Sequence, residues 1–178
     1  MELLQGEAFT NLFRTCQRSA FHLEMQDEYH TPEEAEPFRR FLAGEDDDYA
    51  WHQPWLDLVS EVTTSGVIMT RARIVTVPHT DYVRWSLAVA PKNIAAGEDL
   101  RWLPRHLAEG IGFPENDYWL LNDDRLVLTV FAEDGRFLGG TEMTDHALIE
   151  QCRTVRNQVW ARAIPHDEYV SSSTMGSN

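Results

Sequence analysis

The first half of the chain mixes helical and strand-like patterns of apolar residues. Apolar side chains in residues 7–18 recur at the three- and four-residue spacing of an amphipathic helix. Phe21, Leu23 and Met25 then alternate with polar residues, which predicts a short, half-buried strand. Further patterns predict helices over 31–44 and 51–66 and a strand over 67–77. Helices and strands therefore interleave from the start of the chain.

The segment Thr31-Pro32-Glu33-Glu34 predicts a helix start. A threonine before the helix and a glutamate three residues later can each satisfy a free backbone N–H group at the helix end, and proline is favoured in the first turn. This helix is predicted to end at Gly44. Its inward-facing residues are predicted to be Phe38, Phe41 and Leu42.

Residues 82–90 fit two kinds of element. Val83, Trp85, Leu87 and Val89 alternate as in a strand, whereas Val83, Leu87, Ala90 and Ile94 have helical spacing. We favour a helix over 80–97, because Thr80-Asp81 is a good helix start and Ala95-Ala96-Gly97 a good end. Pro91 would kink that helix near its middle.

The second half of the chain is rich in strand patterns separated by turns. Strands are predicted around 100–103, 118–121, 126–131 and 137–138, with a polar connector over 104–115. A last helix is predicted from a Thr144 cap to Ala163, before Pro165. The fold class predicted is α+β, or α/β, with helices packed on a mixed or antiparallel sheet. Residues 1–170 would form one domain and residues 171–178 a disordered polar tail.

Charge and cysteine content exclude several classes of function. Fifteen Lys and Arg against 29 Asp and Glu leave a net charge of −14, which opposes direct binding to nucleic acid or to anionic membranes. No stretch approaches the ~18 consecutive apolar residues of a membrane helix, and the first residues lack the apolar run of a secretory signal. Cys16 and Cys152 lack metal or redox spacing and are predicted to be buried thiols in a cytoplasmic protein.

Motifs for catalysis, metals and cofactors are absent from the sequence. There is no G-x-S-x-G elbow, no G-x-x-x-x-G-K-[ST] loop, and no zinc spacing among the seven histidines. Fourteen of the fifteen basic residues are arginine, so a lysine nucleophile or base could only be Lys92. His166-Asp167-Glu168 is dense but lies near the end of the chain, where exposure is expected. We predict no catalytic residue, metal or cofactor.

One group of charged residues is a candidate ligand site. Arg71 and Arg73 are two apart on a predicted strand, so they project from the same face and could bind an anion. The alternative is a network of ion pairs that holds a helix against the sheet, as also occurs without function. The strand, helix, strand order could gather the whole group along one side of the sheet: Arg71, Arg73, Asp81, Tyr82, Arg84, Glu98 and Arg101.

The chain resembles an uncharacterised actinobacterial family known as a domain of unknown function. The resemblance covers nearly the whole chain. It is carried by F-x-x-L-F at 9–13, S-A-F-H-L-E at 19–24, R-A-R-I-V-T-V-P at 71–78, D-Y-V-R-W at 81–85, N-I-A-A-G-E-D-L-R at 93–101, N-D-Y-W-L-L at 116–121 and W-A-R-A-I-P at 160–165. Members are often encoded near helix-turn-helix regulators, which implies regulation through protein contact.

A weaker likeness is to one half of a phospholipase D-like fold. There a helix leads into G-x-x-[IVL]-R, a hairpin follows, and a late helix ends in W-x-x-A-x-P. Residues 97–101 and 160–165 match that outline. The H-x-K motif of those enzymes is missing, so the resemblance implies a non-catalytic version.

Three functions are therefore expected, in this order. The first is a non-catalytic cytoplasmic regulatory or binding protein that contacts a DNA-binding regulator, drawn to it by charge. The alternative is a small-molecule sensor or enzyme that uses Arg71, Arg73 and Tyr82 to bind an anion. The third is a structural subunit whose exposed aromatic residues form a homo-oligomer.

Overall fold

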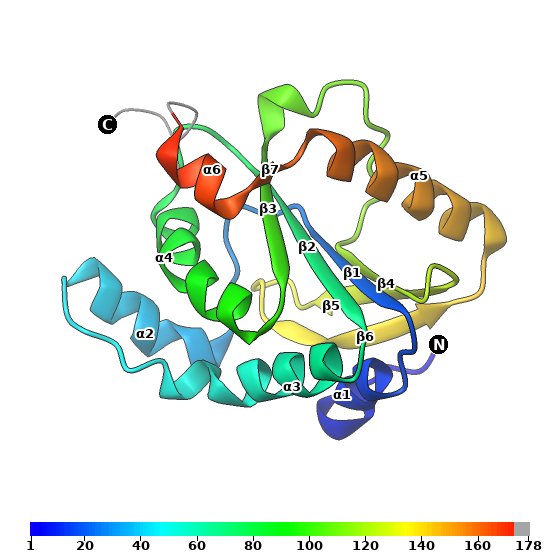
Figure 1. Ribbon diagram of the computed structural model, residues 1–178, viewed down its shortest axis with the longest axis horizontal. Coiled ribbons are helices and arrows are strands. Elements are labelled where there is room, and N and C mark those ends of the chain that lie inside the picture. Colours follow the sequence, from blue (N-terminus) through cyan, green and yellow to red (C-terminus); the bar gives the residue numbers. More distant parts are fainter. Residues whose placement is uncertain (173–178) are drawn as a thin grey trace.

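A computed structural model describes residues 1–172 as one domain, in which a seven-stranded sheet carries helices on both faces (Figure 1). Short 3-10 turns lie at Ala50–His52 and Arg105–Leu107. In the part of the chain described, the α-helices are α1 (Gly6–Arg14), α2 (Pro32–Leu42), α3 (Gln53–Thr64), α4 (Asp81–Ala96), α5 (His146–Arg162) and α6 (His166–Ser171).

The sheet is mixed, with the strand order β6-β5-β4-β1-β2-β3-β7. β1, β2 and β3 run parallel, and the other neighbours pair antiparallel. The strands are β1 (Ser19–Glu24), β2 (Ile68–Val75), β3 (Asp99–Pro104), β4 (Tyr118–Leu121), β5 (Arg125–Phe131), β6 (Phe137–Met143) and β7 (Ile164–Pro165). Since β1 and β2 are flanked on both sides, the centre of the sheet is parallel and enclosed.

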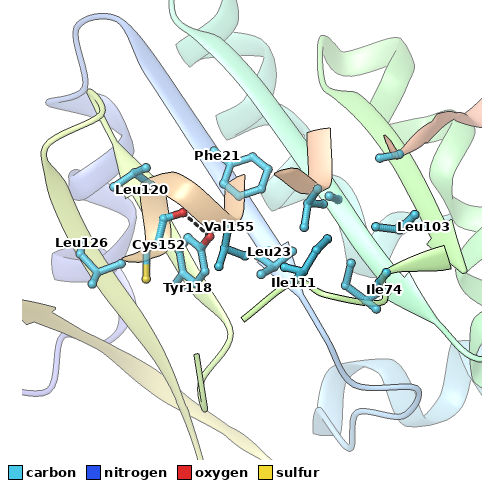
Figure 2. Packing of buried hydrophobic residues seen from close by; sticks show 14 of the residues in the cluster. Phe21, Leu23, Ile74, Leu103, Ile111, Tyr118, Leu120, Leu126, Cys152 and Val155 are labelled. Atoms are coloured by element: carbon cyan, nitrogen blue, oxygen red, sulfur yellow. Dashed lines mark hydrogen bonds between the residues drawn. The ribbon is translucent and has the colours of Figure 1, made fainter. Parts of the chain in front are cut away.

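One face of the sheet packs against α5. Phe21, Leu23 and Leu120 pack against Cys152 and Val155 there (Figure 2). Ile111, in the segment that follows β3, packs against the same cluster. The Tyr118 hydroxyl donates a hydrogen bond to the Cys152 carbonyl at 2.8 Å. This face is a dense apolar core that fixes the sheet from one side.

The opposite face packs against α1, α2, α3 and α4. Phe13, Val59 and Met69 form an apolar cluster at the amino-terminal end of β1 and β2. Trp102 and Tyr169 form a second cluster beside α4 and α6. The middle of this face, between the two clusters, carries the polar side chains described below.

The predicted fold class is confirmed as α+β with a mixed sheet. Residues 81–96 form a helix, not a strand, and the Thr80 side chain accepts a hydrogen bond from the Val83 N–H as a cap should. Pro91 lies inside α4 without ending it. The run from 118 to 143 forms the expected antiparallel series of strands.

Several local predictions were wrong. The prediction that β1 is half-buried fails because helices cover both faces of the sheet, so His22 and Glu24 are 7% and 8% exposed. Leu42 points outward and is 54% exposed. The Thr31 side chain makes no capping hydrogen bond, and Asp145 rather than Thr144 caps α5 by accepting from the Ala147 and Leu148 N–H groups.

The carboxyl-terminal segment also differs from its prediction. His166 is buried, because the unpredicted β7 and α6 fold residues 164–171 back against β3. Residues 173–178 of the predicted tail lie outside the described residues. None of the described helices is both long and apolar enough to span a membrane.

The homo-oligomer hypothesis rests on exposed aromatic residues. Within residues 1–172 the large apolar side chains that are exposed are all aliphatic or methionine: Met1, Leu3, Leu42, Ile68, Ile94, Leu107 and Val170. The structure therefore removes the reason for that hypothesis without testing the oligomeric state.

Candidate functional site

A buried ion-pair network occupies the middle of the sheet face that α3 and α4 cover. Parallel pairing sets His22 beside Arg71 and Glu24 beside Arg73, so four polar side chains project from the same face of β1 and β2. Arg71 bridges two carboxylates, because its Nη1 group contacts Glu24 and its Nε lies 2.5 Å from Glu98 Oε1. Arg73 Nη1 lies 2.5 Å from the other Glu24 oxygen.

The network compensates the cost of burying its charges. Burial alone would raise the pKa of Glu24, but the positive charges of Arg73 and Arg71 outweigh it and hold that pKa well below its usual range. Burial likewise opposes the charged form of Arg71, and the carboxylates of Glu98 and Glu24 raise its pKa instead. Both groups are therefore ionised at neutral pH and depend on each other to remain so.

Hydrogen bonds extend the network to α4 and to the 3-10 turn that precedes α3. Asn93 on α4 donates from Nδ2 to Glu98 Oε2 at 2.8 Å, and its Oδ1 lies 2.7 Å from His52 Nε2. Because an amide oxygen accepts, this histidine nitrogen is the donor. On the other side, His22 Nδ1 lies 2.9 Å from the Tyr118 carbonyl and its Nε2 lies 3.2 Å from Glu24 Oε1. The network thus connects the central strands to α4 and to the turn before α3.

A cavity of about 280 Å³ lies over this network. Its wall is largely aromatic, and the rings contact one another at centroid separations between 5.4 and 5.9 Å. Starting from Tyr29, the contacts run through Tyr82, Trp85 and Trp51 on one side, and through Phe131, Phe137 and Phe9 on the other.

The floor of the cavity is formed by the sheet and α3. Trp119 stacks on His22 with ring centroids 4.1 Å apart and planes 7° from parallel. The Arg71 guanidinium carbon lies 5.9 Å from the Trp55 ring centroid and 5.8 Å from that of Trp119. Cation–π contact thus adds to the ion pairs that immobilise Arg71.

Two further carboxylates line the cavity outside the ion-pair network. Glu34 on α2 accepts a hydrogen bond from the Tyr82 hydroxyl at 2.7 Å, and Asp117 accepts one from the Tyr29 hydroxyl. Asp117 also accepts from the Met25 N–H at 2.9 Å. Burial raises the pKa of both carboxyl groups, and no arginine, lysine or histidine among residues 1–172 lies within ion-pair distance of either.

Glu24 Oε2 is ion-paired with Arg73 but makes no hydrogen bond. Three other cavity-lining residues hold a buried polar atom with neither kind of partner among the described residues. These atoms are Trp55 Nε1, Arg73 Nε and Thr129 Oγ1. Thr129 is 3% exposed. Leaving such a group unpaired costs about 1–3 kcal/mol, so an arrangement with three of them at one cavity favours a ligand that supplies acceptors.

The structure brings together part of the sequence-predicted group. Arg71, Arg73 and Tyr82 line the cavity, and Glu98 lies behind Arg71. Asp81 and Arg84 instead form an exposed ion pair on the first turn of α4. Arg71, Arg73 and Tyr82 each contact a carboxylate of the chain itself. That they bind a ligand stays a prediction.

Arg101 lies on the other face of the sheet. It is in register with Ala72, whose side chain points away from those of Arg71 and Arg73. Its guanidinium carbon lies 4.0 Å from the Trp160 ring centroid, and it pairs with Asp99 at 3.1 Å. Side chains alternate between the two faces of a strand, so the register between β2 and β3 determines the face on which Arg101 lies.

Most residues of the cavity were missed by sequence reasoning. His22 and Glu24 looked like the solvent side of a strand, and Trp51 and Trp55 looked like ordinary core. The sequence does hold one signal for the cavity: β1, β2 and β4 each carry polar or amphipathic residues at alternate positions. These strands are neighbours in the sheet, so such residues lie side by side on one face. That signal requires the strand order, which the sequence does not supply.

Fold and site together define a single-domain α+β protein with an aromatic cavity above a buried arginine–carboxylate network. Residues 7–171 match the family described as Domain of unknown function (DUF6879), and the chain belongs to that family. Among proteins with curated descriptions, no sequence matches this chain.

Two solved structures are similar to this chain at low sequence identity. NucT from Helicobacter pylori is 8% identical, with 89% of this chain and 88% of that chain covered and a TM-score of 0.49. TrmBL2, described as an archaeal chromatin protein with a novel mode of DNA binding, is 10% identical with a TM-score of 0.44. The match covers 88% of this chain and 47% of TrmBL2.

Proposed function

We propose that this protein binds a small molecule in the aromatic cavity and acts as a non-catalytic sensor. The observation that carries the proposal is the presence of three unpartnered polar groups, at Trp55, Arg73 and Thr129, on the wall of one cavity. At about 280 Å³ the cavity lies near the lower end of the roughly 300–1,000 Å³ typical of ligand pockets, so its occupant would be metabolite-sized.

The aromatic wall favours a ligand with a flat or apolar part. Nine Phe, Tyr and Trp rings line the space, and aromatic walls gain energy by offset or edge-on contact with another ring. The unpartnered Trp55 N–H and Arg73 N–H are donors only, so the ligand would also carry acceptor atoms. A ring compound with carbonyl, hydroxyl or ring-nitrogen acceptors meets both conditions.

The lysine and cysteine side chains lie away from the cavity, so neither residue type supplies a nucleophile there. Lys92 is exposed on α4, with its Nζ 5.0 Å from the Tyr49 ring centroid, and does not line the cavity. Cys16 and Cys152 are free and buried elsewhere, and burial raises the pKa of Cys152 to about 11. Two unoxidised thiols also support the proposed cytoplasmic location.

The test uses a threonine inside the cavity and a matched one outside it. A library of ring compounds would be screened by thermal shift and by tryptophan fluorescence, since Trp51, Trp55, Trp85 and Trp119 line the cavity. Thr129→Val should weaken the compounds found by about tenfold, the value of one hydrogen bond. Thr141→Val, at a buried threonine in register with Leu128, should leave their affinity unchanged.

A second variant removes a different donor. Trp55→Phe keeps a ring but loses the Nε1 donor, so compounds that accept from Trp55 should also bind less tightly to it. If every compound bound Thr129→Val and Trp55→Phe as tightly as it bound the unmodified protein, the ligand site would lie elsewhere and the proposal would be wrong.

A partner protein remains the second candidate for function. The net charge of −14 favours a basic partner, and we propose a helix-turn-helix regulator as that partner. The two candidates are compatible, since a sensor must pass its state to another molecule.

A further inference from the structure

The charges around the cavity do not balance. Glu24, Glu34 and Asp117 line it and Glu98 lies directly behind Arg71, so four carboxyl groups meet two guanidinium groups. Glu24 and Glu98 are matched by Arg71 and Arg73. Glu34 and Asp117 are therefore the two carboxyl groups of this set that form no ion pair among residues 1–172, although Arg71 and Arg73 act on Glu34, and His22 acts on Asp117, from a greater distance.

The two carboxylates that form no ion pair each accept a hydrogen bond from a tyrosine, and the two tyrosine rings contact each other. The rings of Tyr29 and Tyr82 have centroids 5.7 Å apart, and their hydroxyls donate to Asp117 and Glu34 respectively. Burial and the nearby carboxylates raise the pKa of both tyrosines well above the usual value. Both hydroxyls therefore stay protonated and can only orient the carboxylates, without neutralising them.

We propose that the ligand of this cavity carries a positively charged amine, which Glu34 and Asp117 bind and the rings of Tyr29, Tyr82 and Phe131 enclose. This inference rests on the proposed function and names the class of ligand. An ammonium group would supply the missing positive charge in a region where burial strengthens attraction between opposite charges. It would also lie against ring faces, which attract cations.

The same geometry argues against the anion expected from the two arginines. Arg71 holds two carboxylates of the chain, and Arg73 holds one. An anion would have to displace Glu24 from Arg73 or lie beside three carboxylates. The remaining free donor of Arg73, its Nε–H, is suited to a neutral acceptor atom of the ligand.

The test compares three probes that differ in charge and share a phenyl ring: phenethylamine, phenylacetate and 2-phenylethanol. Binding would be followed through tryptophan fluorescence at neutral pH. We expect phenethylamine to bind at least tenfold more tightly than phenylacetate. We expect 2-phenylethanol to lie between them, because it fits the rings without meeting the charge.

Glu34→Gln then tests the group that binds the amine. Glutamine keeps an acceptor for the Tyr82 hydroxyl, so the local structure should persist while the negative charge is lost. Phenethylamine binding should weaken about tenfold and 2-phenylethanol binding should not change. Glu33→Gln, at an exposed position on the same helix, is the control and should affect neither probe. Asp117→Asn should act like Glu34→Gln.

The outcomes separate this inference from the proposed function. If phenylacetate or 2-phenylethanol bound as tightly as phenethylamine, or Glu34→Gln and Asp117→Asn left phenethylamine binding unchanged, the amine inference would be overturned and the cavity would still be a ligand site. If no probe bound and no ring compound stabilised the protein, both would be overturned.

Discussion

At the scale of single residues, the site depends on polar side chains buried as a connected set. Arg71 is the centre, since it contacts Glu24 and Glu98 and its guanidinium carbon lies within 5.9 Å of the ring centroids of both Trp55 and Trp119. Removing one member leaves its partners charged and without compensation, which costs more than the pair contributed. The stability of the domain is therefore tied to the residues that line its cavity.

Arg71→Leu should reduce the free energy of unfolding by about 3–5 kcal/mol, because it leaves the buried Glu98 carboxylate without a positive partner and Glu24 with Arg73 alone. Arg71→Lys should cost less, since it keeps the charge but lacks the separate N–H groups that reach both carboxylates. Urea unfolding measures both values. Arg84→Leu is the control: it breaks an exposed pair with Asp81 and should cost less than about 1 kcal/mol. Equal losses for Arg71→Leu and Arg84→Leu would contradict this account.

At the scale of elements, the short β7 and α6 show how distant residues create structure that local patterns do not signal. Trp102 on β3 donates from Nε1 to His166 Nδ1 at 3.0 Å. Tyr169 stacks on Trp102 and its hydroxyl lies 2.8 Å from His79 Nε2. A six-residue helix is held by these buried contacts, because it is too short to be stable by itself.

The docking of α6 should depend on pH through His166. Its Nδ1 can accept from Trp102 only while unprotonated, and burial lowers the pKa of His166 below its usual value. The folded state therefore binds fewer protons than the unfolded state just below the usual pKa of about 6.5. The stability from this residue should be present above that pH and be lost as the pH falls through it.

Measuring the free energy of unfolding at several pH values checks this prediction. His166→Asn keeps an acceptor that does not titrate, so the variant should lose less stability on acidification than the unmodified protein. His106→Asn, at an exposed histidine, should follow the unmodified protein. If His166→Asn had the same pH dependence as the unmodified protein, the histidine would not control the docking of α6.

At the scale of the whole molecule, the sheet separates two different environments. The face under α5 is filled by apolar side chains (Figure 2), whereas the face under α1, α3 and α4 contains the ion-pair network and the cavity. In the sensor that we propose, the ligand would contact only the second of these faces. Such an arrangement would let ligand binding alter the surface of α2, which supplies Glu34.

The proposed attraction of a basic partner depends on the net charge of the whole molecule, −14. The purified protein should bind a helix-turn-helix regulator at low salt, and added salt should weaken that binding through screening. Calorimetry at two salt concentrations measures both effects. Absence of binding at low salt, or affinity independent of salt, would rule out attraction through the net charge.

The kinds of element could be predicted from the sequence, since they follow from local periodicity. The helix of α4 was favoured by its Thr80 cap, and the series of strands from 118 to 143 by its turns. Both signals lie within a few residues of the element they determine. The candidate site was predictable in part: Arg71, Arg73 and Tyr82 do lie together at the cavity.

Local periodicity in the sequence was enough to predict the α+β class and most element positions. Spacing along the chain also placed Arg71 and Arg73 on one face, because it sets which way a side chain projects. Only the tertiary structure decided that His22 and Glu24 are buried and that Arg101 lies on the opposite face. Those outcomes depend on strand order, register and covering helices. Each is a contact between segments far apart in the chain, and no local pattern records it.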